Sequence, residues 1–398
     1  MTLLPRFHRA PNSLGILVGV AAAWWLWPTV APAQNGANLP PLPPPLNVPQ
    51  PGPSTGGPYA PQPIVPGGVV VPLYAPDSPE LNQARVAEPE QYQYWGPVTL
   101  GAIVGIHNPS IEFHPGNGQL NTGAVVILAA GGGHRSLNVG SEAAPFVSFF
   151  AHHGVSTVIL RNRLRSDGYD PRVHGVNDTL QAIRLVRAYA EQWRVDPAKI
   201  GVMGFSAGGE LAACASLDWE AFDERVNAAD GREDPFRGVS SRPDFVALIY
   251  PGPTPFAHGA RPPIPRAAPP AFIAGPGWGD WIHAVWATEY FTALLHNGVP
   301  NVEMHLYARG HHPGDQVPPD EPPATGGLAN MGGLAFGTWS ARLLEWMRDL
   351  GFLNPPGEPT RAARDVAAQL AREPRRMRPP PSPPASGASP STPAATSR

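Results

Sequence analysis

The chain has 398 residues, of which 42% are hydrophobic, and a formal net charge of −3 at pH 7. No long basic block precedes the C-terminal tail, which argues against nucleic-acid binding as the main task. Many of the 54 prolines lie in residues 40–76 and 355–393, and these stretches lack the apolar periodicity that a core requires. We therefore predict one large α/β domain at residues 91–354, preceded by a Pro/Gly-rich linker at 34–90 and followed by a Pro/Arg-rich disordered tail at 355–398.

The N-terminal residues have the pattern of an export signal. Arg6 and Arg9 precede an apolar run at 14–27, and Ala31-Pro32-Ala33 follows it. This order predicts a secretory signal peptide at 1–33, cleaved after Ala33. The alternative is an uncleaved membrane anchor, although the run of about 14 residues is short of the roughly 20 that span a bilayer. Both interpretations predict a secreted or periplasmic domain, and a single cysteine is compatible with this because no intramolecular disulfide is needed.

Between the two proline-rich stretches, short apolar runs alternate with segments of helical periodicity. The runs expected to form strands are 124–130, 155–160, 200–203, 245–250, 271–274 and 302–307. The segments expected to form helices are 141–152, 177–193, the stretch after residue 206, 284–295 and 338–350. This alternation predicts an α/β fold whose mostly parallel central sheet is covered by helices on both faces. In such sheets the reacting groups gather at the carboxyl ends of the strands.

One motif predicts nucleophilic chemistry. The sequence Gly204-Phe205-Ser206-Ala207-Gly208 follows an apolar run and precedes good helix formers. It therefore fits the G-x-S-x-G nucleophile elbow, in which a serine occupies a strained turn between a strand and a helix. Glycines flank the serine because neighbouring backbone approaches the turn too closely for a Cβ atom.

A serine hydroxyl needs a histidine base, which in turn is oriented by a carboxylate. On this fold the order along the chain is serine, acid, histidine. Asp280 directly follows the 271–274 run, whereas Glu289 lies within a predicted helix. His311 and His312 both follow the last predicted strand, and either one fits the position of the base.

Acyl transfer also requires donors to the oxyanion of the tetrahedral intermediate. The backbone N–H of Ala207 and those of Gly132 and Gly133, in the glycine loop after the first predicted strand, are the candidates. The alternative for the loop is a flexible turn.

Four further residues are candidates for substrate binding, and each has a structural alternative. His134 follows the glycine loop and fits a surface position equally well, and His311 directly precedes His312. Trp278 and Trp281 flank Asp280 and fit an apolar or sugar-stacking wall, or ordinary packing. No metal site is predicted. Besides His311 and His312, the chain has one other pair of adjacent histidines, at 152–153, and this pair lacks an accompanying carboxylate and fits a helix end. We expect Cys214 to face the core and Arg163 with Asp178 to form a structural ion pair.

Taken together, these residues resemble the acetylxylan-esterase-like branch of the α/β-hydrolase superfamily. The blocks that carry the resemblance, over roughly 108–353, are residues 124–134, 162–164, 200–209, 247–251 and 309–312. The resemblance implies Ser206 as nucleophile, Asp280 as acid and His312 as base. The chain departs from the family pattern at Asn162, at His134, at Gly279, at His311 and after His312, positions that line the site and bear on substrate identity.

These expectations describe a secreted serine esterase that cleaves small acyl esters, with acetyl groups on plant polysaccharide as the suggested substrate and no cofactor. One alternative is another serine hydrolase such as a peptidase. The other is a non-catalytic protein that keeps the hydrolase shell, whose Pro-rich ends contact the cell envelope as spacers.

Overall fold

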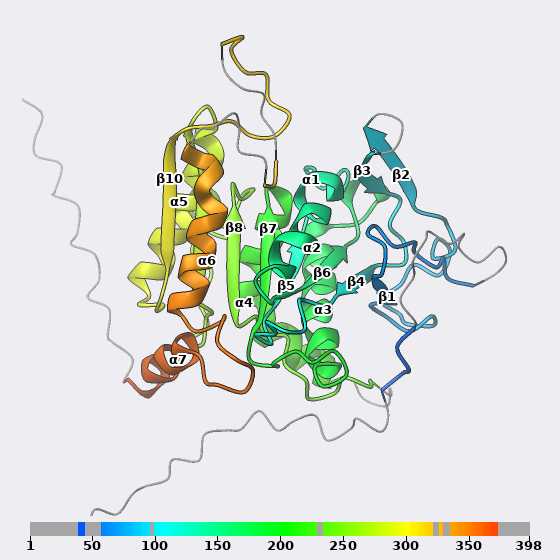
Figure 1. Ribbon diagram of the computed structural model, residues 1–398. Coiled ribbons are helices and arrows are strands. Elements are labelled where there is room, and N and C mark those ends of the chain that lie inside the picture. The colour runs from blue at the N-terminus through cyan, green and yellow to red at the C-terminus, as the bar shows by residue number, and fades with distance from the viewer. Residues whose placement is uncertain are drawn as a thin grey trace, which may run out of the picture. The chain divides into compact units, whose positions relative to one another are not determined.

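The computed structural model describes residues 39–43, 57–95, 99–228, 234–320, 326–328 and 335–372 (Figure 1). The expected signal peptide at 1–33 lies outside them. Within these ranges, no helix combines the length and apolar character that crossing a membrane would demand.

The centre of the fold is an 8-stranded sheet with the order β1-β4-β6-β5-β7-β8-β9-β10. Its strands are β1 (Val69–Pro72), β4 (Ser110–His114), β6 (Ser156–Arg161), β5 (Val125–Ala129), β7 (Ile200–Phe205), β8 (Phe245–Ile249), β9 (Ala271–Trp278) and β10 (Glu303–Arg309). The strands from β6 to β10 in this order pair in parallel, whereas β4 pairs antiparallel with both β6 and β1. A separate hairpin joins β2 (Gln91–Trp95) to β3 (Thr99–Val104). The central parallel strands are buried over their whole length, which explains why they are continuous apolar runs in the sequence.

Helices cover both faces of the sheet. The helices are α1 (Val139–Glu142), α2 (Ala144–Ala151), α3 (Val176–Ala188), α4 (Ala207–Ala228), α5 (Trp281–His296), α6 (Trp339–Asp349) and α7 (Arg361–Ala371). Alternate side chains of β5 enter two separate cores, because successive residues of a strand point to opposite faces. Ile127 packs in the core under α3, α4 and α5, and Leu128 packs in the core under α2 and α6 (Figure 1). The predicted layer architecture is therefore confirmed.

The boundary predicted at residue 91 is wrong. Residues 57–90 are part of the folded body: β1 lies within them, and Tyr59, Leu81 and Val86 are buried. The proline density misled the prediction, because proline is compatible with an edge strand and β1 ends at Pro72 on the edge of the sheet.

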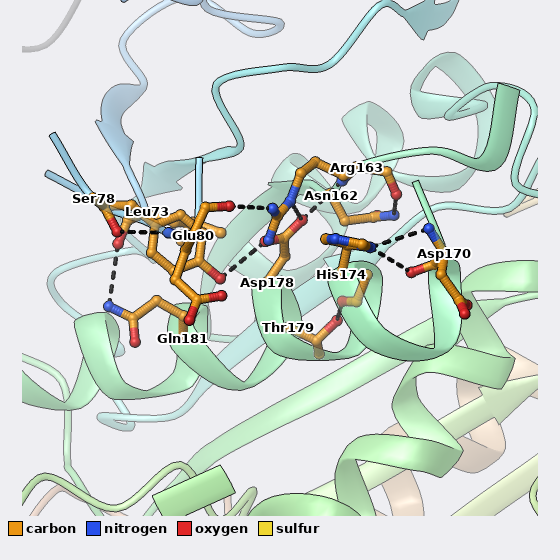
Figure 2. Close-up of polar contacts among 12 residues, drawn as sticks. Leu73, Ser78, Glu80, Asn162, Arg163, Asp170, His174, Asp178, Thr179 and Gln181 are labelled. Atoms are coloured by element: carbon orange, nitrogen blue, oxygen red, sulfur yellow. Dashed lines mark hydrogen bonds and ion pairs between the residues drawn. The ribbon is translucent and has the colours of Figure 1, made fainter. Parts of the chain in front are cut away.

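Residues 57–90 are held to the sheet and to α3 by buried polar groups (Figure 2). The Arg163 guanidinium pairs with Asp178 at 2.6 Å and donates to the Glu80 carbonyl at 2.6 Å. Tyr74 donates to Asp178 at 3.0 Å, and Gln181 donates to the Leu73 carbonyl. The predicted structural role of the Arg163–Asp178 pair is confirmed, since both side chains are fully buried and bind residues of the N-terminal segment.

The start of the predicted tail also folds. Thr360 caps α7 by accepting a hydrogen bond from the Ala363 N–H at 3.0 Å, and Val366 is buried. Just before this helix, the ammonium group of Lys199 donates to the carbonyls of Thr122, Asn354 and Pro355. Lys199 is fully buried, so its three acceptors join distant parts of the chain inside the protein. Residues 373–398 of the predicted tail lie outside the described residues.

Candidate active site

Ser206 occupies the turn between β7 and α4 with a left-handed φ of 49°. A Cβ atom on Gly204 would lie 2.1 Å from the Gly208 carbonyl oxygen, and one on Gly208 would lie 2.0 Å from the Ala129 carbonyl oxygen. The turn is therefore possible only with glycine at both positions. Its backbone is held in place because the Ser206 N–H donates to the Ile249 carbonyl at 3.0 Å.

The structure brings the three side chains of the predicted triad together. The Ser206 Oγ lies 3.0 Å from Nε2 of His312, and Nδ1 of His312 lies 3.2 Å from Oδ2 of Asp280. Asp280 is the N-cap residue of α5, directly after β9, and His312 follows β10. Of the two adjacent histidines it is His312 that faces Ser206. His311 is buried against Gly279, where an added Cβ would lie 2.6 Å from its Nδ1 atom.

Asp280 has a second imidazole partner. Nδ1 of His283 bonds Oδ1 of Asp280, and the His283 ring stacks on His312 with centroids 3.9 Å apart. Burial opposes ionisation of Asp280, but the hydrogen bonds from His283 and His312 outweigh it and hold the pKa of this carboxyl below its ordinary value. Asp280 is therefore an anion at neutral pH, which is the state that orients a histidine base.

The glycine loop after β5 lies against the nucleophile. A Cβ on Gly131 would lie 2.9 Å from the Ser206 Cβ, and Gly132 and Gly133 have φ angles of 125° and 62°. The Gly131 N–H donates to Glu142, but no hydrogen bond to another described residue occupies the N–H groups of Gly132, Gly133 or Ala207. These three donors are available to a developing oxyanion.

Glu142 connects the glycine loop to Tyr250, which packs against His312. Its Oε2 accepts the Gly131 N–H at 2.7 Å, and its Oε1 accepts the Tyr250 hydroxyl at 3.0 Å. The Tyr250 ring in turn lies edge-on to His312 with centroids 5.3 Å apart. Burial raises the pKa of Glu142 to about 7, against the opposing effect of the two hydrogen bonds.

His134 is neither on the surface nor directed at open space. It is buried, and its Nε2 lies 3.0 Å from Oε2 of Glu210, whose other oxygen accepts from Arg172 at 2.5 Å. Arg172 also donates to the sulfur of Cys214, which is buried on α4 as predicted. Burial raises the pKa of the Cys214 thiol to about 12, so this cysteine remains protonated and is a poor nucleophile.

Trp278 and Trp281 flank Asp280 and are 75% and 68% exposed, so they are not packing residues. Trp278 ends β9 and Trp281 begins α5, on either side of Asp280 in the chain. Exposed indole rings at this place are available to an extended substrate.

Sequence reasoning missed His283, Glu142, Tyr250 and Glu210. Two of these had a local signal: His283 is three residues after Asp280 and Glu210 is four after Ser206, and side chains at such spacings share a helix face. Glu142 and Tyr250 are 108 residues apart, and only the folded sheet brings them together.

The cluster Asp280, His283 and His312 is also the group of described residues that could hold a metal ion. One ligand atom from each lies within 4.8 Å of the others. No metal site was predicted from the sequence, because the two histidines at 152–153 lack an accompanying carboxylate. The prediction did not include this cluster, whose members are brought together by the fold.

Comparisons with known proteins find similarity over part of the chain. Residues 113–238, which include Ser206 but neither Asp280 nor His312, match the BD-FAE family model. An acetylxylan esterase of Xylanibacter ruminicola is 30% identical over 130 residues, which cover 33% of this chain and 23% of that protein. Endo-1,4-beta-xylanase B of Butyrivibrio fibrisolvens is 34% identical over 76 residues, 19% of this chain and 11% of that protein. The chain thus spans less than a quarter of the length of these curated relatives.

Among solved structures, the acetyl ester-xyloside bifunctional hydrolase from Caldicellulosiruptor lactoaceticus is similar at a TM-score of 0.53 and 24% identity. The likeness covers 73% of this chain and 98% of that chain. The protein therefore has the α/β-hydrolase fold, as predicted. The resemblance to esterase-like α/β-hydrolases is also confirmed.

Proposed function

We propose that this protein is a serine esterase that hydrolyses small acyl esters through Ser206, His312 and Asp280. The observation that carries the proposal is the continuous contact from the Ser206 Oγ through His312 to Asp280, at 3.0 and 3.2 Å. The partial match to an acetylxylan esterase supports the same reaction class.

In the first half of the reaction the Ser206 Oγ attacks the ester carbonyl carbon while Nε2 of His312 takes the hydroxyl proton. Asp280 accepts the Nδ1–H of His312 and stabilises the imidazolium that forms. The N–H groups of Ala207, Gly132 and Gly133 stabilise the oxyanion. His312 then protonates the departing alcohol oxygen, which leaves the acyl group on Ser206.

In the second half a water molecule gives a proton to His312 and attacks the acyl carbonyl carbon. Collapse of the second tetrahedral intermediate returns the proton from His312 to the Ser206 Oγ and releases the carboxylic acid. Every proton transfer uses the same Nε2 atom, and the reaction as written needs only these side chains, the backbone N–H donors and water.

The substrate that we propose is an acetyl ester on a plant polysaccharide such as acetylated xylan. Exposed Trp278 and Trp281 beside Asp280 support this choice, because indole rings present flat apolar surfaces on which sugar rings stack. We further propose that the protein is exported to the periplasm or the exterior, from the apolar run at 14–27 and Ala31-Pro32-Ala33. We also propose that the Pro-rich residues outside the folded body contact the cell envelope.

The test is hydrolysis of p-nitrophenyl acetate by the full chain, its Ser206→Ala variant and its His312→Ala variant. We expect each substitution to lower kcat by about 10³-fold or more. Ser148→Ala and His296→Ala, at exposed helix positions, are the matched controls and should keep full activity. An inactive wild type, or a Ser206→Ala variant as active as wild type, would overturn the proposal.

A fluorophosphonate probe separates the esterase from a non-catalytic hydrolase shell. The probe should label wild type at Ser206 and should not label Ser206→Ala. A wild-type protein that resists labelling favours the binding-protein alternative.

A further inference from the structure

Asp280 holds two histidines with one carboxylate. Nδ1 of His283 contacts its Oδ1 atom, and Nδ1 of His312 lies 3.2 Å from its Oδ2 atom. The two rings are parallel within 4° and their centroids are 3.9 Å apart. Both Nδ1 atoms face the Asp280 carboxylate. An acid that orients a histidine base needs one imidazole partner, so the second imidazole on Asp280 goes beyond what a catalytic triad requires.

Two imidazoles and a carboxylate that lie close together are typical ligands of a transition-metal ion of intermediate softness, such as Zn²⁺. Ligand atoms around a tetrahedral zinc ion lie about 3.3 Å apart, as follows from bond lengths of about 2.0–2.2 Å. One nitrogen or oxygen from each of the three residues already lies within 4.8 Å of the others.

We propose that Asp280, His283 and His312 form a binding site for Zn²⁺ and that the bound ion switches off the proposed esterase. The site uses Nδ1 of both histidines and a carboxylate oxygen of Asp280, and water completes the coordination. The ion reaches it from solvent, because the His283 and His312 side chains are 16% and 17% exposed.

Inhibition follows from the tautomer that the metal imposes. Coordination at Nδ1 of neutral His312 requires its proton to reside on Nε2. Nε2 is the atom that lies 3.0 Å from the Ser206 Oγ, and once protonated it cannot accept the serine proton. Zinc also withdraws the carboxylate of Asp280 from its contact with His312. This regulatory role rests on the proposed esterase function, whereas the metal site itself does not.

The first measurement is calorimetric titration of Zn²⁺ into the full chain after chelator treatment. We expect one ion per chain, and no comparable binding of Mg²⁺, which prefers oxygen ligands. His283→Asn should weaken Zn²⁺ binding by at least about tenfold while retaining a donor to Asp280. His305→Asn is the matched control, because His305 also pairs with a carboxylate, Glu303, at 2.7 Å, but among the described residues it belongs to no cluster of three metal-ligating side chains. His283→Gln is a second variant in case His283→Asn does not fold.

The second measurement is p-nitrophenyl acetate hydrolysis with increasing Zn²⁺, expressed for each variant relative to its own metal-free rate. The concentration for half inhibition should rise in His283→Asn by the same factor as the calorimetric Kd, and a chelator should restore the rate. Absence of zinc binding by wild type, or equal binding by His283→Asn, would overturn the site. Tight binding at the site without inhibition of an active enzyme would overturn the regulatory role. A metal-free wild type that binds zinc as expected but hydrolyses no ester would contradict the esterase proposal and leave the site standing.

Discussion

The imidazole ring of His283 lies flat against that of His312, with planes 4° apart and centroids separated by 3.9 Å. His283 thus contacts both the base and, through Nδ1, the acid of the proposed triad. Because it acts on the base through ring stacking and through Asp280, we assign it a positioning role in the metal-free protein.

His283→Ala should therefore lower kcat for p-nitrophenyl acetate about tenfold, equivalent to about 1.4 kcal/mol of transition-state stabilisation. The ring that fixes the orientation of His312 is lost together with the donor to Oδ1 of Asp280. KM should change little, since no substrate contact is removed. His283→Asn, which restores the donor alone, should have an intermediate kcat. A change confined to KM, or an unchanged kcat, would contradict the positioning role.

Glu142 should make the stability of the protein depend on pH between about 4.5 and 7. Burial raises the pKa of Glu142 from 4.5 to about 7, so in this window the native state holds a proton that the unfolded chain has lost. The free energy of unfolding therefore falls as pH rises, by up to about 3 kcal/mol over the window.

The matched variant is Glu142→Gln, which cannot titrate but keeps an acceptor for the Gly131 N–H. Urea unfolding at several pH values should show this variant gaining stability relative to wild type as pH rises from 4.5 to 8. Parallel stability curves for the two proteins would show that Glu142 does not titrate as described.

The Arg163–Asp178 pair should make a large contribution to stability. Asp178→Asn leaves the buried guanidinium without its anionic partner, which costs about 3–5 kcal/mol in comparable pairs. Urea unfolding measures the loss. Glu345→Gln, which breaks the exposed Arg342–Glu345 pair at 2.7 Å, is the control and should have no measurable effect. Equal stability of the two variants would contradict the importance of the buried pair (Figure 2).

The exposed tryptophans should distinguish a polymeric from a small substrate. Trp278→Ala and Trp281→Ala should each raise KM for acetylated xylan about fivefold, equivalent to about 1 kcal/mol of lost stacking. Hydrolysis of p-nitrophenyl acetate should stay the same, because this ester is too small to reach both rings. Trp278→Phe and Trp281→Phe, which keep an aromatic face, should recover part of the affinity. Identical effects on both esters would indicate a structural role for the indoles.

Local signals were sufficient for the centre of the fold and for the proposed catalytic residues. The strand before Ser206 is a continuous apolar run, and the glycines around Ser206 are needed because a Cβ atom there would clash with neighbouring backbone. The order of serine, acid and histidine placed Asp280 and His312 after the correct strands, although the choice between His311 and His312 needed the structure.

Features that depend on distant partners were not predictable. The segment at 57–90 was assigned to a linker because its prolines conceal β1, whose partner β4 lies about 40 residues further along the chain. The same holds for Glu142, whose burial next to Tyr250 has no counterpart in the local sequence. The helix at 361–371 was missed for a related reason, since flanking prolines obscured an amphipathic segment that has a threonine cap.

The burial of Lys199 gives the protein an internal reporter of its own unfolding. It is the only lysine of the chain, and its ammonium group is enclosed by the carbonyls of Thr122, Asn354 and Pro355. Apart from the α-amino group, an amine-reactive reagent therefore finds no target on the native protein. The rate at which such a reagent modifies Lys199 records how often the join between the body of the sheet and the segment leading to α7 opens.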